Sequence, residues 1–271
     1  MKRIITAIML PLVILGLIFI TSCKGKDSKD QKKIELEQMD TLKGQIGSHV
    51  YPLPSSAEVI KMLQDLEVGY IFGISNPVEN TRKYFKSDAR AINMGVYGAD
   101  LSYATLYNIQ QELINYLDAI RSLAAELNMS QIYDPTLYDK IRQNFDYKDQ
   151  LVKILTEAFD ETYAYLSDNE QEPLALLVVG GAWVEGMYLT THVSEAAYQV
   201  AGISKNLLEQ KSSFELYIDI TKPYLNDPIV GDFVKKLDPI KKVYEGLGTS
   251  LTEKNIMDIT NAIEEVRSQI I

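Results

Sequence analysis

The chain has 271 residues, of which 24% are charged, and a formal net charge of −10 at neutral pH. A two-signed but net acidic surface argues against nucleic acid as a partner. Because Cys23 is the single cysteine, intramolecular disulfides are excluded and a hydrophobic core must hold the fold together.

The first 23 residues show the order of features that is typical of a secretory signal. Two basic residues precede nineteen uncharged ones, 4–22, and small residues lead up to Cys23. The sequence at 20–23, Ile-Thr-Ser-Cys, resembles the lipobox of bacterial lipoproteins. In that family the cysteine thiol is lipidated, with acyl chains such as palmitate, and the signal is cut before it. The resemblance implies a signal peptide at 1–22 and a membrane anchor at Cys23.

An uncleaved membrane helix is the alternative for residues 4–22, since nineteen uncharged residues just span a bilayer. Either arrangement tethers the rest of the chain to a membrane and places it outside the cytoplasm. In the lipoprotein family, Asp after the cysteine favours the inner membrane in some bacteria, and Lys24 stands there in this chain. We therefore expect a lipid-anchored protein of the bacterial cell envelope, with the outer membrane favoured, facing the periplasm or the cell surface.

A flexible tether is predicted for residues 24–50, which are charged and low in aromatics, so the anchor and tether together occupy 23–50. A random coil of this length reaches about 30 Å. The tether's lysines suit an anionic leaflet, although a solvated spacer is the simpler interpretation. Residues 51–271 then form the folded domain.

The folded domain is predicted to be all-α. From Ser55 onward, apolar residues recur in steps of three and four, and no long alternating run indicates strands. The clearest apolar stripes lie in 97–128, 147–168, 230–237 and 256–270. We expect a multi-helix bundle of about eight or nine helices, either as one domain or as two packed helical halves.

Helix starts are marked by pairs of an Asx residue and a proline. The Asx side chain can cap free amides, and proline suits the first helical position. Ser55 with Glu58 also fits a capping box, and Pro173 predicts a start without an Asx cap. The four Asx–Pro pairs are Asn76-Pro77, Asp134-Pro135, Asp227-Pro228 and Asp238-Pro239.

Residues 174–189 are apolar on every side except at Glu185, which predicts a helix buried among others. Gly180, Gly181 and Gly186 make this segment a poor membrane span but would let a neighbouring helix approach closely. Each glycine weakens a helix by about 1 kcal/mol relative to alanine, so packing must offset the loss. We predict that this is the central helix.

Glu185 is the anomaly in that helix, because a buried carboxylate must find partners or stay protonated. Tyr188 and His192 share its helical face, and Glu195 follows three residues later. One interpretation is a ligand, metal or proton-transfer site. The interpretation we favour is a satisfied polar network between helices. Trp183 flanks the same segment and joins the candidate binding residues.

A second acid shows a related spacing. Asp100 and Tyr103 are spaced like Glu185 and Tyr188, at an offset of 85 residues. The offset would place the two acids on matching helices that face one another. Positions further along do not support it, so chance is the favoured explanation. Within its own helix Asp100 lies opposite the apolar stripe, which predicts a solvated or groove-lining position.

Residues 190–195, Thr-Thr-His-Val-Ser-Glu, are similar in part to the Gly-x-His-x-x-Glu motif of imelysin-type envelope lipoproteins. His192 and Glu195 match, while Thr190 replaces the glycine. The resemblance implies iron-linked binding through the two matching residues. Glu185 is about 10 Å from His192 along a helix axis, too far to share an ion easily.

Three functions follow from these patterns. The preferred one is a non-enzymatic, lipid-anchored helical domain that binds a ligand or an envelope protein, without a cofactor. The second is a metal-associated, imelysin-like protein or an enzyme, and the third is a structural component of an envelope complex. No phosphate-binding glycine loop, zinc-protease motif or Gly-x-Ser-x-Gly elbow is present. The candidate binding residues are Glu185, Tyr188, His192, Glu195, Trp183, Asp100 and Tyr103.

Overall fold

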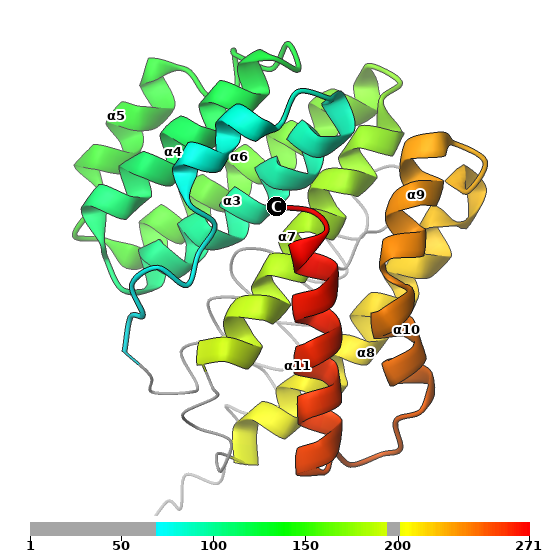
Figure 1. The fold of residues 1–271 in the computed structure, drawn as a ribbon. Helices are drawn as coiled ribbons and strands as arrows, with labels where there is room; N and C mark the ends of the chain where they lie inside the picture. Colours follow the sequence, from blue (N-terminus) through cyan, green and yellow to red (C-terminus); the bar gives the residue numbers. More distant parts are fainter. Residues whose placement is uncertain (1–68, 194–200) are drawn as a thin grey trace, which may run out of the picture. The chain divides into compact units, whose positions relative to one another are not determined.

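The computed structural model describes residues 69–193 and 201–271 (Figure 1). Every regular element in these ranges is helical, which confirms the predicted all-α bundle. The predictions for the signal peptide, Cys23, the tether, the capping box at Ser55 and Glu195 concern residues outside these ranges. The elements are the 3₁₀ helices η1 (Val78–Lys83) and η3 (Lys222–Tyr224) and nine α-helices, α3 (Ser87–Leu106), α4 (Gln110–Ala125), α5 (Pro135–Gln143), α6 (Lys148–Asp168), α7 (Glu172–Val193), α8 (Ala201–Thr221), α9 (Pro228–Lys236), α10 (Asp238–Glu245) and α11 (Glu253–Ser268).

Helix α7 is the central helix, as its uniformly apolar sequence predicted. It packs against α3 along most of its length and also contacts α6, α9 and α11. Among the described residues it is the one helix long and apolar enough to cross a membrane, and 94% of that stretch is buried in the protein. Such burial is the ordinary property of a core helix in a helical bundle.

Two glycines allow α3 and α7 to touch backbone to backbone. A Cβ atom at Gly95 would overlap the Val178 carbonyl oxygen, and one at Gly181 would overlap the Ile92 carbonyl oxygen. Beyond this crossing Asp100 of α3 interacts with Glu185 of α7, so the two helices run in the same direction. This close crossing determines which side chains of α3 and α7 meet further along.

The apolar stripe predicted over 97–128 belongs to two helices rather than one. Helix α3 ends at Leu106, and α4 begins at Gln110. Between them Asn108 adopts a φ of 52°, a left-handed conformation that asparagine tolerates better than most residues. The helical period continues across this turn, which is why periodicity alone did not reveal it.

The Asx–Pro pairs differ in what they do. The Asp134 side chain caps α5 by accepting from the Leu137 N–H, and Asp227 caps α9 by accepting from two N–H groups. Pro173 lies in the first turn of α7, as predicted. Asp238 is already inside α10 and caps nothing, because α9 and α10 follow each other with only Leu237 between them. The Asn76 side chain also caps no helix and enters a buried network instead.

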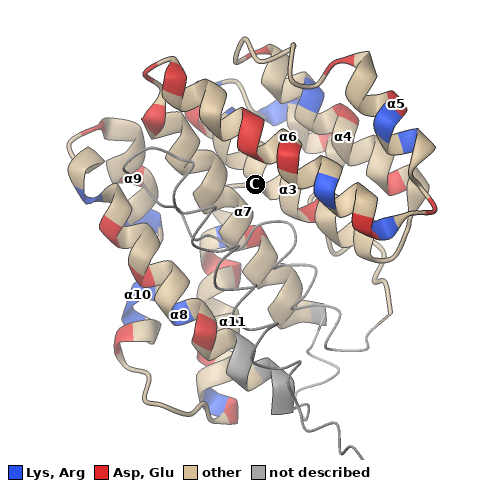
Figure 2. Cartoon of the chain, turned by 180° about the vertical axis from the view of Figure 1, so that it is seen from behind, with Lys and Arg blue, Asp and Glu red and all other residues tan. Residues whose placement is uncertain are grey.

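Charged side chains of both signs are interspersed along the outer helices (Figure 2). Several form pairs one helical turn apart, such as Lys153 with Glu157 at 3.8 Å and Lys254 with Asp258 at 2.7 Å. Exposed pairs of this kind contribute about 0–1 kcal/mol each. The stability of the bundle therefore rests on its apolar core and on the buried polar groups described next.

Candidate functional site

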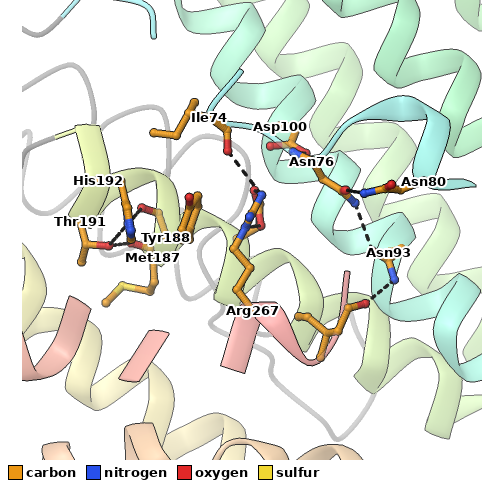
Figure 3. Close-up of polar contacts among 12 residues, drawn as sticks. Ile74, Asn76, Asn80, Asn93, Asp100, Met187, Tyr188, Thr191, His192 and Arg267 are labelled. Atoms are coloured by element: carbon orange, nitrogen blue, oxygen red, sulfur yellow. Dashed lines mark hydrogen bonds and ion pairs between the residues drawn. The ribbon is translucent and has the colours of Figure 1, made fainter. Parts of the chain in front are cut away.

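The buried Glu185 is paired with an arginine from the other end of the domain. Arg267, near the end of α11, donates from Nε to Oε2 at 2.6 Å and from Nη2 to Oε1 at 2.8 Å. The Glu185 side chain is 0% exposed and that of Arg267 is 10% exposed. Arg267 Nη2 also donates to the Ile74 carbonyl at 3.4 Å (Figure 3). Both carboxylate oxygens of Glu185 are therefore satisfied within the described core.

The same arginine organises the rest of the predicted row. Its guanidinium carbon lies 3.8 Å from the centre of the Tyr188 ring. That ring packs on the His192 ring, with the centroids 3.9 Å apart, and His192 Nδ1 is 2.9 Å from the Tyr188 carbonyl oxygen (Figure 3). A cation over a partly desolvated aromatic face is stabilised by about 1–2 kcal/mol. The prediction that Glu185, Tyr188 and His192 share one face is confirmed.

Asp100 is fully buried, so its predicted solvated or groove-lining position is wrong. The face of α3 opposite its apolar stripe is covered by the segment before η1 and by α7. The Asn76 N–H donates to Asp100 Oδ2 at 3.1 Å (Figure 3). Burial raises the pKa of Asp100 well above its ordinary value, the neighbouring Glu185 raises it further, and Arg267 opposes the shift.

Asparagines extend this cluster to the C-terminal end of α11. Asn76 Nδ2 donates to Tyr84 Oη at 3.0 Å and to Asn93 Oδ1 at 3.3 Å, while its own Oδ1 accepts from Asn80. Asn93 Nδ2 donates to the Ile270 carbonyl at 2.8 Å (Figure 3). We name the set Asn76, Asn93, Asp100, Glu185, Tyr188 and Arg267 the polar junction. It fastens α11 to α3 and α7 over a large sequence separation.

The arginine and the asparagines were missed from the sequence. Arg267 directly follows Val266 of the last apolar stripe and lies four residues after Ile263, so its position at the edge of a buried face was a usable signal. Arg267 stays charged although it is buried. Desolvation lowers its pKa, but the pairing with Glu185 outweighs this effect and raises the pKa overall. Nothing in the local sequence identified Asn93 as a partner of the chain's end.

The remaining candidate residues lie apart from the junction. Trp183 is buried on another face of α7, where its Nε1 donates to Gln210 Oε1 at 3.2 Å and its ring packs on Phe214. Tyr103 is buried against Tyr70, with ring centroids 4.8 Å apart. Burial raises the pKa of Tyr103 to about 12. Both residues therefore serve the core, and neither faces Glu185 across a shared pocket.

The described residues contain no group of three or more His, Cys, Asp or Glu side chains placed to hold a metal ion. Glu185 uses both oxygens on Arg267, and only His192 of the imelysin-like pair lies in the described ranges. Hollows lined by described residues lie elsewhere. One is an apolar void of about 20 Å³ between α3, α4 and α6, and another is a polar hollow of about 210 Å³ beside α5 and α6.

Fold and site together define an all-α helical bundle with a charged junction sealed in its core. No family model matches the chain, and no curated protein or solved structure matches it either. The functional argument therefore depends on the residues of this chain alone.

Proposed function

We propose that this chain is a lipid-anchored helical protein of the bacterial cell envelope whose folded domain binds a protein partner and is not an enzyme. The observation that carries the proposal is the lipobox-like sequence ending at Cys23. In the described core, Glu185 is fully engaged by Arg267, and neither the void between α3, α4 and α6 nor the hollow beside α5 and α6 is lined by these two residues. A sealed junction of this kind supports a role in holding the domain together rather than in reacting with a substrate.

A protein partner is favoured over a small molecule by the exposed aromatics. Phe72 and Phe85, which lie on either side of η1, are 75% and 77% exposed. Aromatic side chains are enriched in protein–protein interfaces relative to the rest of the surface. The hollow beside α5 and α6 is lined by Asp134, Glu157 and other polar residues, unlike the mostly apolar pockets that enclose small ligands.

The anchor is tested by replacing the thiol with a hydroxyl, Cys23→Ser, in the native host. We expect the variant to lose lipid labelling and to keep residues 1–22 uncleaved, while a Thr21→Ser control is labelled and processed as before. A second variant, Cys23→Ser with Ser28→Cys, moves the thiol five residues along the chain. We expect this variant to lose lipid labelling and cleavage as well. Unchanged lipid labelling and cleavage of Cys23→Ser would contradict the anchor.

The partner is tested with a photoreactive amino acid placed at position 72 or 85 of the anchored protein. We expect a discrete adduct from these positions. Control probes at the exposed Lys235 and Lys254 are expected to give none. If all four positions give the same adducts, or none gives any, the proposed surface is wrong.

A metal-associated function is the second candidate, and the half-buried position of His192 at the end of the junction favours it. The partial resemblance to imelysin-type lipoproteins would make His192 and Glu195 the iron-linked residues. Elemental analysis of the purified chain separates this candidate from the first. Stoichiometric iron that is lost in His192→Gln would favour it, whereas a metal-free protein whose melting is unchanged by chelators would exclude it.

A further inference from the structure

We propose that Asp100 and Glu185 hold a single proton between them, and that this proton makes the attachment of α11 to the bundle dependent on pH. The inference concerns the polar junction itself and is independent of where the protein resides. It assigns the proton to one oxygen atom, Oδ1 of Asp100.

The first argument is the charge balance of the junction. The glycine-mediated crossing of α3 and α7 makes the two acids neighbours, and both are 0% exposed. Among the described residues Arg267 is the cation that faces them, and it makes two hydrogen bonds to Glu185. One positive charge balances one carboxylate, so a second ionised carboxylate at this distance would be uncompensated. Two carboxyl groups that share a site in this way retain a proton.

The second argument is the hydrogen bonding of Asp100. Its Oδ2 accepts from the Asn76 N–H. Its Oδ1 is buried and makes no well-formed hydrogen bond among the described residues, and the same is true of the nearby Ser75 hydroxyl. The Ser75 hydroxyl can donate to Asp100 and lowers its pKa, whereas the ionised Glu185 has no proton to donate and raises it. A protonated Oδ1 can donate to Glu185 and turns the repulsive contact into a charge-assisted hydrogen bond.

The other described groups around Asp100 do not supply a second charge. Tyr70 precedes η1, Tyr97 lies on α3, Tyr116 on α4 and Tyr188 on α7. Burial raises the pKa of each of these phenols, so all four are neutral in the physiological range. Burial and then Glu185 raise the pKa of Asp100 itself, in agreement with the geometry.

The sign of the pH effect follows from linkage. The folded chain keeps a proton on Asp100 that the unfolded chain releases above about pH 4. The stabilisation from this group is therefore complete below about pH 4 and declines as the pH rises towards the raised pKa of the folded state. When the proton leaves, Asp100 competes with Glu185 for Arg267, so the end of α11 is the part of the bundle affected.

The test uses the full-length chain purified in detergent and the substitution Asp100→Asn. The asparagine amide donates to Glu185 at every pH and its oxygen accepts from Asn76, so the variant fixes the proposed protonated arrangement. We expect the infrared C=O band of a protonated carboxyl in the wild type at neutral pH and its loss in Asp100→Asn. Asp160→Asn is the matched control, because burial and then Glu157 also raise the pKa of Asp160, and the Asp100 band must persist in it.

Denaturant unfolding, followed through the buried Trp183, provides the second readout. The wild type is expected to lose stability relative to Asp100→Asn as the pH rises above about pH 4 towards the raised pKa of the folded state. Absence of the neutral-pH band from the wild type, or its persistence in Asp100→Asn, would overturn the proposal. Parallel pH profiles of the two proteins would overturn it as well. If Asp100→Asn does not fold, the carboxyl band is followed by pH titration in the wild type and in Asp160→Asn. A band that is present at neutral pH in both proteins supports the proposal, and its absence from both overturns it.

Discussion

Replacing Arg267 by methionine removes the cation of the polar junction and keeps an apolar stem of similar length. In the structure both oxygens of Glu185 are bound by Arg267 at 2.6 and 2.8 Å, in a site closed to water. The substitution leaves Glu185 buried beside Asp100 with no compensating charge. Breaking a buried ion pair in this way costs about 3–5 kcal/mol of the free energy of unfolding.

The assays are denaturant unfolding and thermal melting, both followed by the fluorescence of Trp183. This residue is the only tryptophan of the chain, lies two residues before Glu185 and is buried. For a domain of this size, about 2–4 °C of melting temperature corresponds to each kcal/mol, so the melting temperature should fall by about 6–20 °C. Lys254→Met is the matched control in the same helix, because it removes an exposed pair with Asp258 and should cost less than about 1 kcal/mol.

A double variant, Glu185→Leu with Arg267→Met, completes the cycle. Replacing a whole buried ion pair by apolar residues is often neutral, so most of the lost stability should return. The reasoning is refuted if Arg267→Met costs no more than the Lys254→Met control. It is also refuted if the double variant is as unstable as the sum of the two single variants, since the two residues would then act independently.

Three further predictions follow from the same structure. Gly95→Ala should destabilise strongly because its Cβ overlaps a carbonyl oxygen of α7. Gly98→Ala, one turn later, places its Cβ at an ordinary contact distance of 3.9 Å from the Phe159 ring and should gain up to about 1 kcal/mol; melting temperatures compare the two directly. Asp227→Ala should cost about 1 kcal/mol through loss of the α9 cap, while Asp238→Ala, which caps nothing, should change the unfolding midpoint little. Tyr188→Leu should lose about 1–2 kcal/mol of cation–π stabilisation and Tyr188→Phe should retain most of it, as measured by the same unfolding assay.

Helical periodicity predicted much of the fold because it is a local property. It identified α7 as the central helix and placed Glu185, Tyr188 and His192 on one face, since these statements need only the angle between residues in one helix. The same local view failed for Asp100. The stripe of α3 marks one buried face, and the opposite face is buried by a segment that precedes η1 and by α7.

The partners of the junction could not be predicted because they are distant in the sequence. Arg267 lies 82 positions from Glu185, and Asn93 lies 177 positions from Ile270. The shared spacing around Asp100 and Glu185 had been explained by chance. The structure brings these two acids together, because α3 and α7 cross in the same direction through Gly95 and Gly181.

The mass of the intact native protein tests the lipid anchor most directly. Our account predicts a chain that begins at Cys23 and carries the additional mass of acyl chains on that residue. A polypeptide of 30.6 kDa that retains residues 1–22, or one with an unmodified Cys23 thiol, would contradict it.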